Sequence, residues 1–294
     1  MMLSRLKEKA IYFLLFLTAF SAVVILAGIF LMLVLNAIRA FKDVGFWDFF
    51  FGTRWNPSAY GEPSYGIVQM IVSTFMTTLG AMLIAVPLGV GAAAYIAEVA
   101  SPRVREILKP AIEILAGIPS VVIGFLGIVL VGPLIADVFG LTSGLNALNG
   151  SILLAVMALP TIMSVSEDAI RAVPSEYKEA SCALGASRWT TLVRVTIPAA
   201  FQGIAASVVL GVGRAVGETM TVLMVTGNAT AMPHGFLDSV RTLTATIAVE
   251  LGEVPYGTAH YYALFAVGAV LFIITLSVNL VAEMITARHR RLMG

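Results

Sequence analysis

Six long apolar runs, almost free of charge, divide the chain. A helix needs about 20 apolar residues to cross about 30 Å of hydrocarbon, and most of the runs reach that length. The runs cover residues 10–38, 67–97, 114–136, 150–165, 201–225 and 261–282. The first run exceeds the 7–15 residues or so of a signal peptide's apolar core, so it predicts an uncleaved helix. The pattern predicts six transmembrane helices with both termini on one side.

Two segments between the runs carry patterns of their own. Residues 39–66 hold an aromatic cluster suited to a membrane interface. Its members are Phe46, Trp47, Phe49, Phe50, Phe51 and Trp55. In residues 237–251, apolar side chains recur at helical spacing, which predicts a short amphipathic helix on or in the outer interface. These side chains are Leu237, Val240, Leu243, Ile247 and Leu251. Prolines in or near the runs indicate kinked packing, or kinks that open a path through the bundle.

Basic residues are distributed unevenly between the two sides. Thirteen of the eighteen fall in the two termini and in the loops after the second and fourth runs: Arg5, Lys7, Lys9, Arg103, Arg105, Lys109, Arg171, Lys178, Arg188, Arg194, Arg288, Arg290 and Arg291. The positive-inside rule places these segments in the cytoplasm. The predicted organisation is an N-terminal helix with an outer aromatic segment (1–66), a transmembrane domain (67–286) and a basic cytoplasmic tail (287–294).

Composition agrees with a membrane protein and excludes several functions. The chain is 59% hydrophobic and 12% charged, with a mean hydropathy of +0.95. Its net charge of +1 gives no reason to expect a nucleic-acid partner. It contains no Gly-Lys dipeptide, hence no phosphate-binding G-x-x-x-x-G-K-[ST] loop, and neither an H-E-x-x-H pair nor a G-x-S-x-G turn. We therefore expect no catalytic residue, metal or cofactor on this chain.

A polar loop at residues 175–198 interrupts the apolar pattern. Pro174 should end the preceding helix, after which Ser175 can cap a short helix that Gly185 ends in a left-handed turn. Ser187 can cap a second short helix, reaching about Val195. The side chains expected to fill a partner's groove are Tyr177, Leu184 and Trp189. The alternative is an ordinary solvated surface loop.

The spacing within this loop resembles a known motif. Glu179-Ala180-Ser181 is followed after three residues by Gly185, and after nine more by Val195-Thr196-Ile197-Pro198. This order is similar to the E-A-A loop of ABC importer permeases, with small or apolar replacements at three positions. The resemblance implies that the loop couples the chain to a cytoplasmic ATPase.

Two charges lie inside the fifth run. Arg214 stands about 20 Å into the predicted helix, where a charge costs at least about 2.5–3.5 kcal/mol without a partner. Glu218 follows four positions later, on the same face of a continuous helix. Either the two form a structural ion pair, or Arg214 serves an anion path and Glu218 holds it in place and tunes how tightly the anion is bound.

The resemblance extends over most of the chain. Similar motifs are Trp55-Asn56-Pro57, Ile118–Val122, Thr161–Ile170, Ala172–Pro174, Leu210–Met220 and Arg241–Ala245. They resemble phosphate-specific ABC importer permeases of the PstC type. This implies an all-α membrane protein with the type I ABC importer permease fold, in a prokaryotic plasma (inner) membrane among membrane lipid. The implied partners are a PstA-type permease, a cytoplasmic ABC ATPase dimer, an extracytoplasmic phosphate-binding protein and inorganic phosphate.

Other functions remain open at this point. A permease for molybdate, tungstate or sulfate has the same requirements, because one arginine cannot distinguish tetrahedral anions. An ion-coupled secondary transporter using Glu218 predicts uptake by this chain alone. An intramembrane enzyme would need a nucleophile–base set, and the sequence offers none.

Overall fold

The computed structural model describes the backbone of residues 2–59 and 61–293. Side chains of residues 1–8, 10, 60, 282 and 285–294 lie outside the described part, including the basic residues Arg5, Lys7, Arg288, Arg290 and Arg291. The helices are α1 (Met2–Ala40), α2 (Phe46–Phe51), α3 (Val68–Ala94), α4 (Pro102–Gly117), α5 (Ser120–Leu126), α6 (Gly132–Phe139), α7 (Ala147–Arg171), α8 (Ser175–Ala183), α9 (Arg188–Thr191), α10 (Ile197–Ala199), α11 (Phe201–Gly217), α12 (Met220–Val225), α13 (Leu243–Glu250) and α14 (Ala259–Met293). Three π-helical segments, η1 (Tyr95–Val99), η2 (Gly127–Val131) and η3 (Leu192–Thr196), and two short strands, β1 (Trp55–Asn56) and β2 (Ser64–Tyr65), complete the elements.

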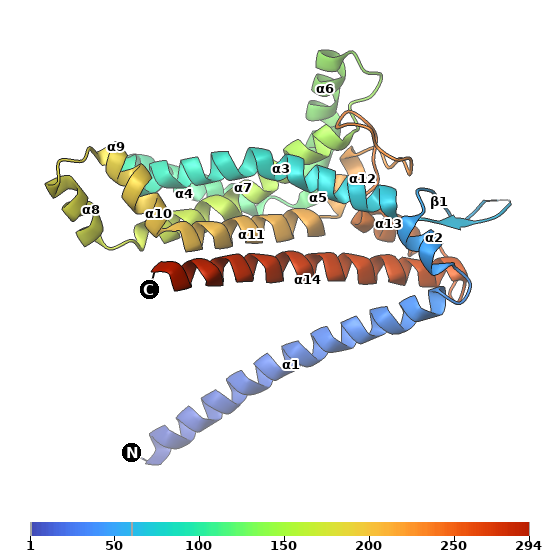
Figure 1. Ribbon diagram of the computed structural model, residues 1–294, viewed down its shortest axis with the longest axis horizontal. Helices are drawn as coiled ribbons and strands as arrows, with labels where there is room; N and C mark the ends of the chain where they lie inside the picture. The colour runs from blue at the N-terminus through green and yellow to red at the C-terminus, as the bar shows by residue number, and fades with distance from the viewer. Residues whose placement is uncertain (1, 60, 294) are drawn as a thin grey trace.

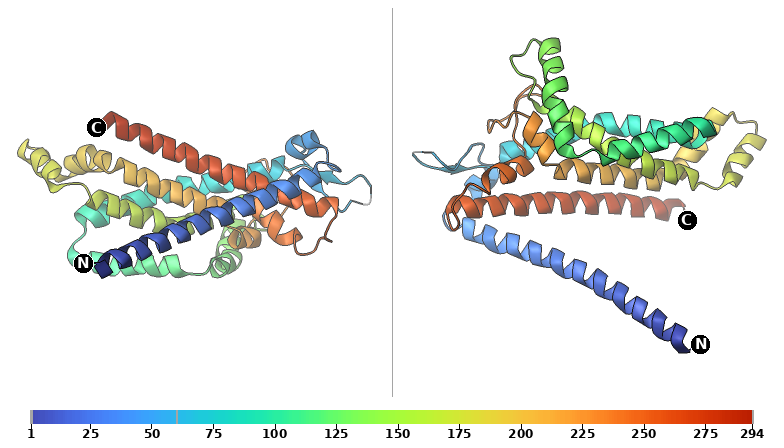
Figure 2. Two further views of the ribbon diagram at one scale, coloured as in Figure 1. Left: turned by 90° about the horizontal axis from the view of Figure 1, so that it is seen from below. Right: turned by 180° about the vertical axis from the view of Figure 1, so that it is seen from behind.

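The long helices form an elongated bundle (Figure 1). Helices α3, α7, α11 and α14 run side by side, and α1 packs on α14 at one end and diverges from it toward the other (Figures 1 and 2). We call the end that carries the 175–198 loop the α8 end. The opposite end, with the antiparallel β1–β2 pair and α13, is the β1 end. Helix α1 starts and α14 finishes at the α8 end, as an even number of spans requires.

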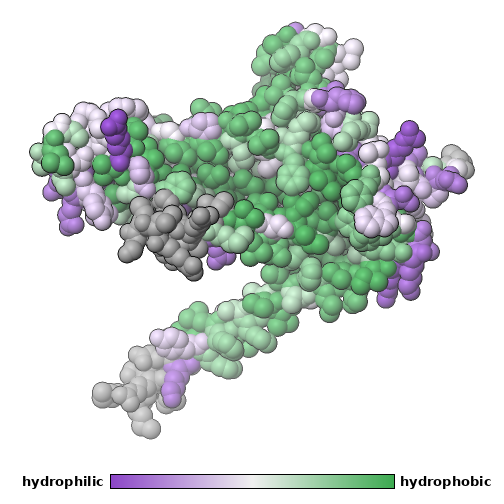
Figure 3. Space-filling view, in the orientation of Figure 1, coloured by the Kyte–Doolittle hydropathy of each residue, from purple (hydrophilic) through white to green (hydrophobic). Residues whose placement is uncertain are grey.

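Apolar helices of spanning length confirm the predicted number of crossings. Within the described residues, five helices are long and apolar enough, and a bent pair, Arg188–Ala199 with Phe201–Gly217, brings the number to as many as six. The five are Ile11–Ala40, Val68–Val99, Ser120–Phe139, Ala147–Arg171 and Ala259–Val281. Hydrophobic surface covers the long helices, and hydrophilic surface gathers mainly toward the ends of the bundle (Figure 3).

Three boundaries differ from the sequence prediction. The third span begins at Ser120 and not at residue 114, because α4 ends at Gly117 and Ile118 is extended before Pro119. The fifth run, 201–225, is two helices separated by Glu218 and Thr219. In the 237–251 segment only α13 is helical, and its first four residues are buried.

Small residues allow the central helices to approach closely. Helix α3 packs on α7, and α7 on α11, around a core of Ala81, Ala85, Leu154, Ala155, Ala158, Ile162, Ala215 and Val222. Gly89 of α3 and Gly211 of α11 both lie against Ile162, so that a methyl group at either position would meet its side chain at 2.8 Å. Close contact through small residues is the usual way in which membrane helices associate.

A buried asparagine fixes the turn that leads into α6. Asn149, completely buried in α7, donates from Nδ2 to the carbonyl oxygens of Gly127 (3.1 Å) and Gly144 (3.0 Å). The carbonyl of Gly127 is at the start of η2, where the hydrogen-bonding ladder is irregular. The backbones of Gly132 and Gly144 touch there, and a Cβ atom on Gly144 would overlap the carbonyl oxygen of Gly132.

We expect Gly144→Ala to destabilise the protein by about 1–3 kcal/mol, because rigid backbone has to move. Gly91→Ala is the control: Gly91 lies within α3, a Cβ there meets nothing within 4 Å, and alanine favours helix. Thermal unfolding of the detergent-solubilised protein should show a lower midpoint for the first variant alone. Equal midpoints would contradict the contact.

Candidate functional site

The 175–198 loop folds as a helix–turn–helix at the α8 end. Gly185 has φ +84°, the left-handed conformation predicted for the turn after α8. Ser187 caps α9 as predicted, since its Oγ accepts a hydrogen bond from the backbone N–H of Thr190 (3.1 Å). The predicted cap at Ser175 is wrong: Pro174 occupies the N-cap position, and Ser175 is the first helical residue. Proline has no side-chain acceptor, so the N-cap residue supplies no side-chain cap to α8.

The side chains expected to face a partner are exposed. Leu184 is 90% exposed, Trp189 71% and Tyr177 58%, and Glu179 and Ala180 also lie on the surface. Leu184 and Trp189 are thus large apolar side chains that the folded chain itself leaves largely uncovered. Surfaces of this kind are typical of protein contacts.

Polar contacts attach this loop to the end of the second span. Lys178 of α8 forms an ion pair with Glu98 of η1. The guanidinium of Arg105 donates to the carbonyl oxygens of Ile96 and Ala97, so it satisfies backbone groups left open at the end of η1. The sequence analysis missed the Lys178–Glu98 pair. Its only signal was a glutamate next to the end of an apolar run, and nothing there indicated the distant lysine.

The loop continues into the fifth span through a bend. Ser181 of α8 and Thr191 of α9 share a hydrogen bond of 2.9 Å, which holds the two short helices together. Then η3 and α10 lead to Ala200, where the chain turns by 68° into α11. Pro198 therefore lies in the short helix before the bend, and the span itself starts at Phe201.

The fifth span breaks at its β1 end. Helix α11 ends at Gly217, and Glu218 is extended, with ψ 130°. The Oε1 atom of Glu218 accepts from the backbone N–H of Thr221 (3.2 Å), so its side chain caps α12. Its carbonyl oxygen accepts from the hydroxyl of Thr244 (2.9 Å), and Thr221 donates to the carbonyl of Ser120 (3.0 Å). Side chains from three segments thus fix the break.

Arg214 is exposed on α11, three residues before the end of that helix. Its Nη1 lies 3.4 Å from the hydroxyl of Thr161 in α7, a contact the sequence analysis did not anticipate. Among the described residues no carboxylate lies within 4.0 Å of its guanidinium, so the structural ion pair with Glu218 is not formed. The prediction of a shared helix face fails because Glu218 has left the helix.

The structure separates the two sets of predicted site residues. The loop set is at the α8 end, whereas the break between α11 and α12 is toward the β1 end (Figure 1). They are connected along the chain by α11. In the described part of the chain, no group of three or more His, Cys, Asp or Glu side chains could hold a metal ion.

Comparison with solved structures defines the fold. A chain of a bacterial ABC transporter involved in the import of the acidic polysaccharide alginate superimposes with a TM-score of 0.61 at 17% identity, over 87% of this chain and 88% of that one. A chain of the MetNI methionine ABC transporter in an inward-facing conformation gives 0.57 at 20%, over 76% of this chain and 94% of that one. The fold is that of an ABC importer permease.

Sequence comparison identifies the family. The family described as binding-protein-dependent transport system inner membrane component matches residues 85–291, and the chain belongs to it. The PstC 1 phosphate transport system permease protein of Mycobacterium tuberculosis is 37% identical, over 88% of this chain and 86% of its own. A probable ABC transporter permease protein of Bacillus subtilis, YqgH, is 39% identical over 83% and 78%.

Because Ser187 caps α9 and Ser175 caps nothing, their alanine variants should differ. We expect Ser187→Ala to weaken α9 by about 1 kcal/mol, which speeds amide hydrogen exchange of residues 188–191 by about fivefold. Ser175→Ala should leave exchange in α8 unchanged. Exchange followed by mass spectrometry measures both, and equal protection in the two variants would disprove the cap.

Proposed function

We propose that this chain is the transmembrane permease subunit of an ATP-driven importer of inorganic phosphate, forming half of its translocation pore. Relatives at 34–37% identity that cover most of the chain are named phosphate transport system permeases. The observation that carries the proposal is Arg214, which is exposed within a spanning segment and has no carboxylate partner among the described residues.

The physical argument concerns the charge of Arg214. A guanidinium within the bilayer needs a counter-charge or a polar cavity, and in the described part of the chain only Thr161 supplies a polar contact to it. Its planar fork of donors matches two oxygens of a phosphate. A passing anion supplies the missing counter-charge, so Arg214 is a binding point on the path.

Glu218 serves the same path in a different way from a simple ion pair. It caps α12 and so fixes the break that follows Arg214. Its negative charge, four positions from Arg214, also limits how tightly an anion is held, which a transporter needs for release. Both residues therefore belong to the proposed anion path.

The orientation and partners follow from the charge distribution and the family. The basic α8 end faces the cytoplasm with both termini, and the β1 end faces outward. A PstA-type permease completes the pore, a dimeric ABC ATPase binds at the α8 end, and a phosphate-binding protein delivers the anion at the β1 end. ATP hydrolysis takes place on the ATPase subunits, because this chain has no nucleotide-binding loop.

The exposed loop is the surface proposed to bind the ATPase. Leu184 and Trp189, with Tyr177, insert into its groove, while Glu179, Ala180 and Gly185 give the loop its shape. Movement of the loop reaches α11 through η3 and α10. It also reaches the end of the second span through the Lys178–Glu98 pair. Binding and hydrolysis of ATP thereby shift the pore between inward- and outward-facing states.

We expect Arg214→Gln to lower phosphate uptake by at least about tenfold, because the charge that meets the anion is lost. Uptake of radioactive phosphate by the reconstituted importer measures this. Arg103→Gln is the matched control, since Arg103 is exposed in α4 at the α8 end. Undiminished uptake by a correctly assembled Arg214→Gln complex removes the proposed path. Competition by molybdate and sulfate distinguishes a phosphate importer from one for another oxyanion.

We expect Leu184→Asp to abolish co-purification of the ATPase, because a buried unpaired carboxylate opposes binding by about 2 kcal/mol or more. Tyr256→Asp, at a residue 79% exposed beyond α13, is the control and should retain the ATPase. Both variants should melt like the wild-type permease. An ATPase that remains bound to the Leu184→Asp permease places the contact elsewhere.

A further inference from the structure

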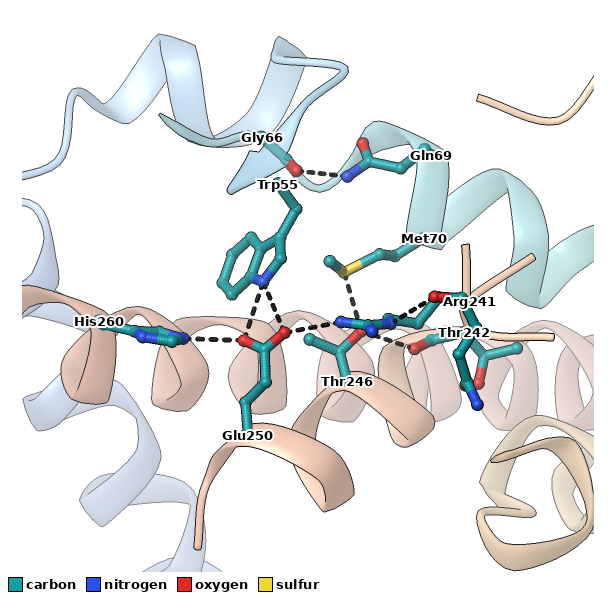
Figure 4. A network of polar contacts seen from close by, with 10 residues as sticks. Trp55, Gly66, Gln69, Met70, Arg241, Thr242, Thr246, Glu250 and His260 are labelled. Carbon is teal, nitrogen blue, oxygen red and sulfur yellow. Dashed lines mark hydrogen bonds and ion pairs between the residues drawn. The ribbon is translucent and has the colours of Figure 1, made fainter. Parts of the chain in front are cut away.

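A polar cluster at the β1 end joins β1 to the segment that runs from Arg241 through α13 to the start of α14 (Figure 4). Glu250, the last residue of α13, accepts hydrogen bonds from Trp55 Nε1 (2.9 and 3.1 Å to its two oxygens) and Arg241 Nη1 (2.7 Å). His260 Nε2 of α14 lies 2.8 Å from its other side. We call these four residues the Glu250 brace.

The brace is half-buried and held by charge. The side chains of Glu250, Arg241 and His260 are 15–17% exposed. Burial by itself raises the pKa of Glu250, but the hydrogen bonds from His260 and Trp55 and the charges of His260 and Arg241 outweigh it, so the pKa lies below its ordinary value. The carboxylate is therefore ionised at neutral pH, and its bonds to Arg241 are of the strong, charge-assisted kind.

Arg241 passes this restraint to the end of α12. Its Nε donates to the carbonyl oxygen of Asn228 (3.0 Å). Gly227 and Asn228, with φ of +84° and +57°, turn the chain sharply after α12. The backbone N–H of Val240, next to Arg241, donates to the carbonyl of Thr226 (2.8 Å). The segment before α13 is therefore hydrogen-bonded to the C-terminal end of α12.

The start of α13 is hydrogen-bonded to the chain just before the N-terminal end of α12. Thr244, in its first turn, donates to the carbonyl oxygen of Glu218, the residue that caps α12. The backbone N–H of Leu243 in turn donates a hydrogen bond to the hydroxyl of Thr74 in α3 (3.1 Å). One short segment, 240–250, thus holds both ends of α12. Glu250 orients Arg241, which contacts the C-terminal end of that helix.

The brace also borders the molecular surface. Trp55, Arg241, Glu250 and His260 line an open hollow at the β1 end, together with Asn56 and Glu253. A protein that docks at this end meets the residues of the brace directly.

We propose that Glu250 is a positioning residue: through Arg241 it holds α12 in register with the break and passes the docking of the substrate-loaded binding protein at the β1 end to the anion path. This inference rests on the proposed import function. It assigns the step after docking to residues that touch neither the anion nor the ATPase. Glu250→Gln keeps the shape of the side chain and weakens its hold on Arg241.

The test uses the complete importer reconstituted in vesicles, with its partner permease, ATPase and binding protein. For Glu250→Gln we expect maximal uptake to fall by about tenfold, from the loss of a charged hydrogen bond. The half-saturating concentration of binding protein and the basal ATPase rate should each change by less than about twofold, because docking and assembly are intact. Glu253→Gln, in the same hollow but outside the brace, should match the wild type in all three.

Other outcomes overturn the proposal. If maximal uptake by Glu250→Gln is unchanged, Glu250 has no positioning role. If only the half-saturating concentration of binding protein changes, Glu250 is a docking residue. If the basal ATPase rate falls as much as maximal uptake does, the role of Glu250 is purely structural. If Glu250→Gln does not assemble, Trp55→Phe decides, since it removes the indole N–H donor and keeps an aromatic ring at that position, and it should lower maximal uptake by about threefold. The assays use whichever oxyanion the wild-type importer carries, so failure with phosphate alone counts against the proposed substrate and not against the brace.

Discussion

A helix end leaves polar backbone groups without partners in the helix, and the need to satisfy them at the break after α11 organises the β1 end of the molecule. The break after Gly217 is tolerated because Glu218 caps the next helix and Thr244 donates to its carbonyl. Thr221 adds a hydrogen bond to the carbonyl oxygen of Ser120, the first residue of α5. The segments around the break are therefore arranged as its hydrogen-bonding partners, and Arg214 lies just before it.

The fifth span also connects the two candidate sites, because the end of α11 opposite the break leads back to the exposed 175–198 loop. The chain passes from the exposed loop through η3 and α10 to the bend at Ala200 and then along α11. Because Glu98 also ties α8 to the second span, a displacement of the loop acts on two crossing helices at once. Both spans pack on α7 and also on each other, so a relative shift between them changes the bundle and not merely one helix.

The sequence was sufficient for features that depend on local composition. Apolar runs predicted the number of spans, and Gly185 and Ser187 predicted the turn and one cap of the loop. The break at Glu218 was not predictable, because an apolar run continues on both sides and the stabilising Thr244 is 26 residues away. The same holds for Trp55 and Glu250, whose contact spans 195 residues and depends on tertiary structure alone.

The packing of α1 carries a consequence for biosynthesis. Its main helical partner is α14, the last helix of the chain, and from residue 11 to residue 32 its large apolar side chains are exposed. The ribosome makes α1 well before α14, so α1 waits in the bilayer without this partner until α14 has been made. A chain that stops before α14 leaves α1 without that partner. Truncated products are therefore open to recognition by membrane quality control, because they lack the contact between α1 and α14.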